Sequence, residues 1–148
     1  MSKRYHNSEK FLNEALSYIP LGSQTFSKSI TQLPFGVSPY FVKRAKGAHF
    51  WDIDDNKFLD FSNALASVTL GYCDNDIDIA VKAQMKNGVS FSLPHTLEYE
   101  VSKLIVDAIP CAEQVRFAKN GTDATSGAIR LARAYTNKDR IAVCGYHG

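Results

Sequence analysis

Apolar residues recur at intervals of three and four positions in four stretches of this 148-residue chain. That spacing puts apolar side chains on one face of an α-helix, so each stretch predicts an amphipathic helix. Ser8 and Thr96 stand at the start of two of these stretches, where a side-chain oxygen would cap the first turn. The predicted helices cover residues 8–18, 76–86, 96–109 and 122–135.

Short apolar runs between turn residues predict strands in the first half of the chain. They cover residues 40–42, 48–53 and 58–61, with breaks at Lys46-Gly47 and at residues 54–56. Turn-forming residues at both breaks indicate a small antiparallel meander. The acidic second break resembles the start of a calcium loop, but it lacks the required glycine and glutamate, so we expect a hairpin turn.

Two further strand-like runs, residues 114–118 and 140–144, enclose the last predicted helix. The order strand, helix, strand predicts a parallel sheet with a right-handed crossover. The fold class is therefore α/β, with a small α/β segment over residues 1–70. Residues 71–148 are interpreted as the incomplete start of a larger parallel-sheet domain, because the chain stops directly after a strand and a glycine turn.

Composition narrows the function classes. A net charge of +2 on a chain with 22% charged residues gives no basic surface for nucleic acid. The polar N-terminus has no apolar signal segment, and no apolar run approaches the roughly 18 residues of a membrane span. The three cysteines are far apart and show no zinc spacing, so no metal site is expected. We expect a cytoplasmic protein that binds neither nucleic acid nor membrane.

The most informative stretch is the glycine turn at Asn120-Gly121-Thr122, which joins a strand-like run to a helix. Backbone amides at a helix N-terminus bind anions, phosphate above all. Gly121 would permit an unusual backbone dihedral or the close approach of a ligand. The turn is neither a P-loop nor a dinucleotide fingerprint, because the further glycines and the lysine of those motifs are missing. The alternative is that Thr122 only caps the helix.

Several motifs in this order resemble class III aminotransferases and glutamate-1-semialdehyde aminomutases. They are KNGTDAT, AIRLARAYTNKDRI and GYHG, with IPLGSQTFSKS, GAHFWDIDDNKFLDF and SFSLPHTLEYEVSKLI upstream. The similarity covers almost all of residues 8–148. It implies a fold-type I enzyme that uses pyridoxal 5′-phosphate (PLP).

The same resemblance assigns roles to residues near the cofactor. Asn120, which stands where the family usually has serine, would hold the PLP phosphate together with Gly121 and Thr122. Tyr146 would stack on the pyridine ring, and His147 would lie beside it in the ring pocket. From the residues alone, an aromatic at the carboxyl end of a strand could also be a packing residue.

The resemblance also implies substrate contacts. Lys28 falls where the aminomutases carry an arginine near the substrate carboxylate, and Leu65 falls where they carry a tryptophan. Ser90 and Ser92 would lie near the substrate. The departures at Lys28 and Leu65 favour a transaminase over an aminomutase.

The expected activity is transfer of an amino group between an amine or amino acid and a carbonyl substrate, in a protein that is a homodimer when full length. Glutamate-1-semialdehyde aminomutase is the alternative within the family, and a non-catalytic interaction fragment is the alternative outside it. PLP chemistry needs a lysine that binds the cofactor covalently. In the family that lysine follows the YHG motif, so no catalytic residue is expected within this chain.

Overall fold

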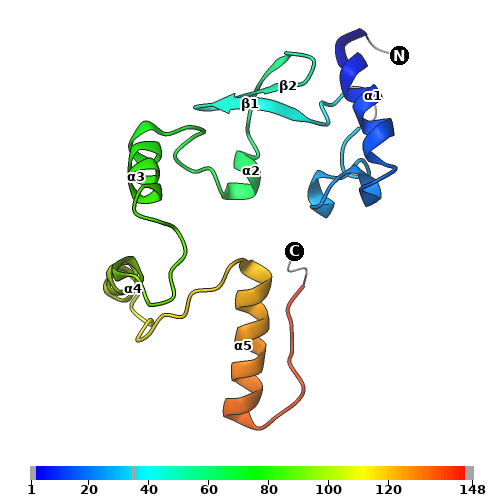
Figure 1. Ribbon diagram of the computed structural model, residues 1–148. Helices are drawn as coiled ribbons and strands as arrows, with labels where there is room; N and C mark the ends of the chain where they lie inside the picture. Colours follow the sequence, from blue (N-terminus) through cyan, green and yellow to red (C-terminus); the bar gives the residue numbers. More distant parts are fainter. Residues whose placement is uncertain (1–2, 35, 146–148) are drawn as a thin grey trace. The chain divides into compact units, whose positions relative to one another are not determined.

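The computed structural model describes residues 3–34 and 36–145 of the chain (Figure 1). The chain divides into two compact units, residues 1–89 and residues 90–148. The predicted boundary near residue 70 concerns the domains of a longer protein, and it stays a prediction.

The first unit contains most of the secondary structure. Its helices and strands, in chain order, are η1 (Lys3–Tyr5), α1 (His6–Ala15), η2 (Pro20–Gly22), η3 (Phe26–Lys28), β1 (Val42–Lys46), β2 (His49–Asp52), β3 (Lys57–Leu59), α2 (Asn63–Ala66) and α3 (Asn75–Met85). The second unit contains α4 (Thr96–Ala108) and α5 (Gly121–Thr136). No helix in the described ranges is both long and apolar enough to cross a bilayer.

Helix α1 begins two residues earlier than predicted, and Ser8 is not its N-cap. Ser8 lies inside the helix, fully buried, and its hydroxyl donates to Asp54 Oδ2 at 2.7 Å. The amides of Asn7 and Ser8 also donate to the Asp54 carboxylate, at 2.8 and 2.9 Å. Asp54 therefore fills the role that the sequence suggested for Ser8, because its carboxylate satisfies amides of the first turn from outside the helix.

The predicted meander is present as a three-stranded antiparallel sheet in the order β1-β2-β3. Its first strand, Val42–Lys46, lies further along the chain than the predicted strand at 40–42 and shares only Val42 with it. The β2–β3 turn is organised by Asp52, a fully buried residue whose carboxylate accepts hydrogen bonds from the Asp54 and Asn56 amides at 3.0 and 2.8 Å. The acidic turn is thus a hairpin turn, as predicted.

Helix α3 is capped by Asp74, whose carboxylate accepts from the amides of Asp76 and Ile77. Helix α4 starts with Thr96, as predicted, but Thr96 is its first helical residue rather than its N-cap. The N-cap is His95: its Nδ1 accepts from the Leu97 amide at 3.2 Å, and its own amide donates to Glu98 Oε1 at 3.1 Å.

The predicted parallel strands at 114–118 and 140–144 are not formed within the described part of the chain. Both segments are irregular, and the only sheet among the described residues is the meander. Helix α5 between them is present. A crossover helix need not join neighbouring strands, and a strand without an adjacent partner makes no ladder hydrogen bonds. Helices α3, α4 and α5 contain no buried residue.

Candidate functional site

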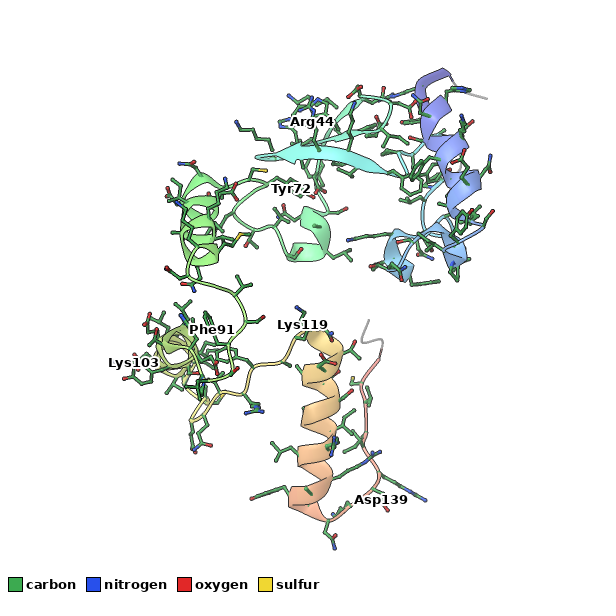
Figure 2. All side chains as sticks on the ribbon, viewed as in Figure 1. Arg44, Tyr72, Phe91, Lys103, Lys119 and Asp139 are labelled. Atoms are coloured by element: carbon green, nitrogen blue, oxygen red, sulfur yellow. The ribbon has the colours of Figure 1, made fainter. Side chains whose placement is uncertain are left out.

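The glycine turn lies at the N-terminus of α5, where Figure 2 labels the preceding residue, Lys119. Asn120 is the N-cap: its Oδ1 accepts from the Asp123 amide at 3.0 Å, and its carbonyl accepts from the Ala124 amide at 3.2 Å. The second bond is the first i→i−4 bond of the helix, and the first satisfies one of the four amides that a helix N-terminus leaves without intrahelical partners. The amides of Gly121 and Thr122 are two of the others.

Thr122 does not cap the helix, because Asn120 does. Within residues 3–34 and 36–145, the Thr122 hydroxyl makes no hydrogen bond; its carbonyl accepts from the Thr125 hydroxyl at 3.1 Å. The hydroxyl and two amides therefore remain as donors at one end of the helix. This donor set suits an anionic group such as a phosphate.

Gly121 has an ordinary helical backbone, not the left-handed one that would demand glycine. The unusual dihedral that the sequence allowed is therefore absent. A methyl group added at Gly121 would meet no heavy atom within 4 Å. Internal packing does not require glycine at this position, and the second expectation, close approach of a ligand, is consistent with the open space.

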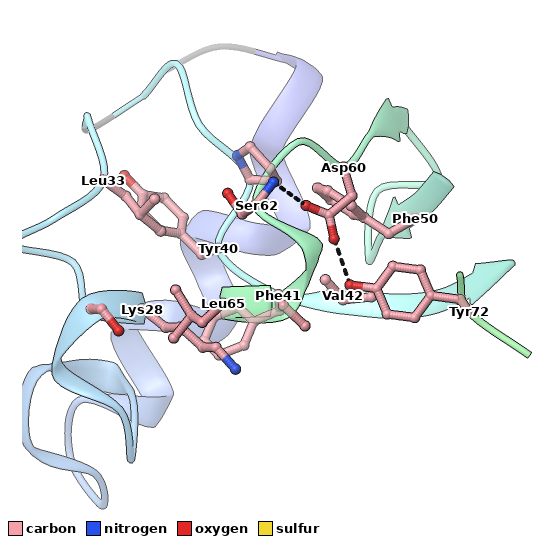
Figure 3. A pocket seen from close by; sticks show the side chains of 13 residues that line it. Lys28, Leu33, Tyr40, Phe41, Val42, Phe50, Asp60, Ser62, Leu65 and Tyr72 are labelled. Atoms are coloured by element: carbon pink, nitrogen blue, oxygen red, sulfur yellow. Dashed lines mark hydrogen bonds between the residues drawn. The ribbon is translucent and has the colours of Figure 1, made fainter. Parts of the chain in front are cut away.

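Two predicted substrate residues line one pocket in the first unit. Lys28 comes from η3 and Leu65 from α2, and the pocket that both line has a volume of about 240 Å³ (Figure 3). Most other lining side chains are apolar or aromatic: Leu33, Pro39, Tyr40, Phe41, Val42, Phe50 and Tyr72. The pocket thus combines the Lys28 ammonium group and the Asp60 carboxylate with a largely apolar wall, which fits a small molecule that carries a polar or charged group.

Leu65 lies on an unusual backbone turn. Asn63, Ala64, Leu65 and Ala66 all have positive φ, between 47° and 67°, so α2 is a left-handed turn. For residues other than glycine this conformation costs roughly 1–2 kcal/mol each, and it persists only where the surroundings hold it.

Asp60 stabilises the beginning of this turn through hydrogen bonds to its carboxylate. Its Oδ1 accepts from the amides of Ser62 and Asn63 at 2.9 and 3.1 Å, and its Oδ2 accepts from the Tyr72 hydroxyl at 2.6 Å. The Tyr72 bond, followed by the amide bonds, lowers the pKa of Asp60 even though burial opposes the shift. The same bond, with burial and the negative charge of Asp60, raises the pKa of Tyr72 to about 12.

Sequence reasoning missed Asp60 and Tyr72. Asp60 was included only in a predicted strand, and Tyr72 had no assigned role. An aspartate two residues before a serine-asparagine pair is the pattern of an Asx turn, and it was the available signal for Asp60. Nothing in the sequence indicates that the Tyr72 hydroxyl donates a hydrogen bond to the same carboxylate.

The remaining predicted residues lie in the second unit or outside the described ranges. Ser90 and Ser92 are exposed, on either side of Phe91, which Figure 2 labels. The Phe91 ring stacks on His95 with centroids 4.9 Å apart. Tyr146 and His147 lie outside the described residues. The structure therefore places Lys28 with Leu65, and Asn120 with Gly121 and Thr122, while the role of each in binding stays a prediction.

Known proteins resemble this chain over nearly its whole length. A family model described as aminotransferase class-III matches residues 33–148. The chain is 43% identical to a glutamate-1-semialdehyde 2,1-aminomutase from Francisella philomiragia, over 96% of this chain and 33% of that protein. An enzyme of the same name from Heliobacterium modesticaldum is 36% identical, over 100% of this chain and 34% of its own. The chain thus spans about a third of the length of these curated relatives.

Solved structures show the same similarity. An omega-transaminase from Sphaerobacter thermophilus matches with a TM-score of 0.83 and 30% identity, over 95% of this chain and 32% of that one. A glutamate-1-semialdehyde aminomutase from Pseudomonas aeruginosa PAO1 matches with a TM-score of 0.75 and 22% identity, over 92% and 29%. At that identity the second match is evidence for a shared fold only.

Proposed function

This chain belongs to the class III aminotransferase family, and we propose that it supplies the N-terminal third of a PLP enzyme of the glutamate-1-semialdehyde aminomutase type. The observation that carries the proposal is the 43% identity to a curated aminomutase over 96% of the chain. The sequence alone favoured a transaminase and kept the aminomutase as the alternative. The relatives support the alternative better.

The proposed cofactor site is the N-terminus of α5. The amides of Gly121 and Thr122 and the Thr122 hydroxyl would donate to the PLP phosphate, while Asn120 would act through its cap, which fixes the first turn. Tyr146 and His147 would border the pyridine ring. When bound, PLP supplies an electron sink for chemistry at the carbon that bears the amine.

The residues of this chain would bind and orient rather than transfer protons. Lys28 would hold a substrate carboxylate through its ammonium group, and Leu65 would shape the apolar wall of the same pocket. Ser90 and Ser92 are proposed as further polar contacts to substrate. The family resemblance places the lysine that completes the site after the YHG motif, so catalysis belongs to the full-length protein.

A transaminase is the second candidate, and the pocket itself favours it. Leu65 makes the wall apolar at the position where the aminomutases carry tryptophan, and Lys28 replaces their arginine. Lysine binds as a point charge and cannot form the two parallel hydrogen bonds of a guanidinium with a carboxylate. The 30% identity to an omega-transaminase structure points the same way.

A comparison of substrates tests the proposal in the purified full-length protein loaded with PLP. Conversion of glutamate 1-semialdehyde, without any added amine, to the isomer whose amino group has moved to the neighbouring carbon would support the aminomutase. Dependence on a separate amino donor, with a keto product released from it, would support the transaminase instead. Failure to retain PLP and to catalyse either reaction would overturn both and favour a non-catalytic interaction fragment. A homodimer in the cytoplasm, acting on small amines and carbonyl compounds, belongs to the same proposal.

A further inference from the structure

Residues 61–71 form a loop whose two ends are fixed at the same place. At one end the Asp60 amide donates to the Ala48 carbonyl at 2.9 Å. At the other, Tyr72 exchanges two backbone hydrogen bonds with Gly47, at 2.8 and 2.9 Å. Gly47 and Ala48 are neighbours in the turn between β1 and β2. Compact loops with adjacent ends of this kind are frequently functional.

A side-chain bond closes the base of this loop. The Tyr72 hydroxyl donates to Asp60 Oδ2 at 2.6 Å, and the Ser62 amide donates to Asp60 Oδ1 (Figure 3). The Asn63 amide donates to the same Oδ1, so both amides that open the left-handed turn bond to Asp60. One carboxylate therefore joins the end of the loop to its beginning. Asp60, Ser62, Ala64, Leu65 and Tyr72 all line the pocket that Lys28 also lines.

We propose that Asp60 is a positioning residue for this pocket: with Tyr72 it holds the 61–71 loop in the conformation that sets Leu65 on the pocket wall. The proposal rests on the proposed function in one respect, namely that the pocket receives substrate. Lys28 comes from η3, a separate element, so a change at Asp60 or Tyr72 would move Leu65 without removing the ammonium group.

The first test measures kinetics in the full-length enzyme. Tyr72→Phe removes only the hydroxyl that donates to Asp60, and Asp60→Asn removes the negative charge but keeps an acceptor oxygen. We expect each variant to raise KM about tenfold, the usual effect of one charge-assisted hydrogen bond, with kcat and PLP absorbance close to wild type. Tyr18→Phe is the matched control, because Tyr18 is in the same unit and 87% exposed. An unchanged KM in both Asp60→Asn and Tyr72→Phe would overturn the proposal.

The second test does not depend on activity. Backbone hydrogen exchange over residues 61–71 reports directly on the loop, and it can be measured by mass spectrometry on the same protein. Tyr72→Phe should accelerate exchange in this segment about tenfold, whereas Tyr18→Phe should leave it unchanged. Wild-type exchange rates in Tyr72→Phe would refute the role of Asp60 even in an active enzyme. Faster exchange in a protein without either activity would support the loop and refute the proposed function.

Discussion

Asn120 Oδ1 accepts a hydrogen bond from the Asp123 amide at 3.0 Å at the start of α5, and this bond distinguishes the residue that caps the helix from the groups that could bind a phosphate. The asparagine side chain is engaged in capping the helix. The groups that remain to bind a phosphate are the amides of Gly121 and Thr122 and the Thr122 hydroxyl. The family resemblance assigns all three residues of the turn to the phosphate without distinguishing capping from binding.

Gly121→Ala tests whether glycine is needed at this position for ligand binding or for packing within the protein. The helical φ and the empty space around Gly121 predict that alanine raises the free energy of unfolding of the cofactor-free protein by about 0.4–1 kcal/mol. The new methyl group would obstruct a phosphate at the amides, so PLP affinity should fall about tenfold or more, a change of roughly 1.4 kcal/mol. Gly127→Ala, in the same helix and equally unobstructed, is the control. Urea denaturation of the full-length protein measures the stability, and PLP titration measures the affinity. Unchanged affinity in Gly121→Ala would mean that no ligand approaches that position.

Thr122→Ala should weaken PLP binding by about 1–2 kcal/mol through the loss of one charge-assisted hydrogen bond. It should leave the stability of the cofactor-free protein nearly unchanged, because the hydroxyl has no partner within the described residues. Thr125→Ala removes a hydroxyl one turn further along, where it bonds to the Thr122 carbonyl, and serves as the control. Equal PLP affinity in the two variants would remove Thr122 from the phosphate site.

Asp54→Asn should destabilise the chain at neutral pH by about 1–2 kcal/mol, the usual contribution of a helix cap. Burial alone would raise the pKa of Asp54, but hydrogen bonds from the Ser8 hydroxyl and the Asn7 and Ser8 amides outweigh it and lower the pKa. A carboxyl whose pKa is lower in the folded state stabilises fully above its unfolded value of 3.8, and the effect disappears as the pH falls through the folded value.

The difference in stability between wild type and Asp54→Asn should therefore shrink at acid pH. Urea denaturation at several pH values measures it. Asp55→Asn is the control: its carboxylate is 63% exposed and pairs with Lys43 at 3.0 Å, so its loss should have little effect at any pH. A pH-independent difference for Asp54→Asn would show that the charge is not what stabilises α1.

Ala66→Gly should stabilise the chain by about 0.5–1 kcal/mol, because glycine adopts the observed φ of 67° without the penalty that alanine incurs. The same substitution at Ala80, inside the right-handed helix α3, should destabilise by about 1 kcal/mol. Opposite signs in thermal or urea unfolding would confirm the left-handed turn. A loss of stability in both variants would contradict it.

The local patterns of the sequence predicted more than its long-range ones. Helical spacing located α1, α3, α4 and α5 within one or two residues in most cases, and the turn residues at 46–47 and 54–56 located the meander. The caps were less predictable. Ser8 and Thr96 have the right chemistry for an N-cap, but Asp54 and His95 occupy the role, the first through a tertiary contact.

The left-handed turn could not be predicted, because Asn63-Ala64-Leu65-Ala66 contains no glycine and good helix formers predominate. Its conformation depends on Asp60 and Tyr72, which are twelve positions apart in the sequence. The pocket that joins Lys28 to Leu65 likewise depends on tertiary structure. The resemblance to known enzymes indicated both residues, while the structure shows that they share one pocket.

The capping of α1 by Asp54 has a consequence for synthesis on the ribosome. Asp54 lies 46 positions after Ser8, so at roughly 5–20 residues per second several seconds separate the translation of the two. Helix α1 has only 10 residues, and isolated helices shorter than about 12–15 residues are marginal in water. Asp54 can therefore stabilise α1 only after the hairpin has been translated. We expect α1 to be among the later elements of this unit to become stable.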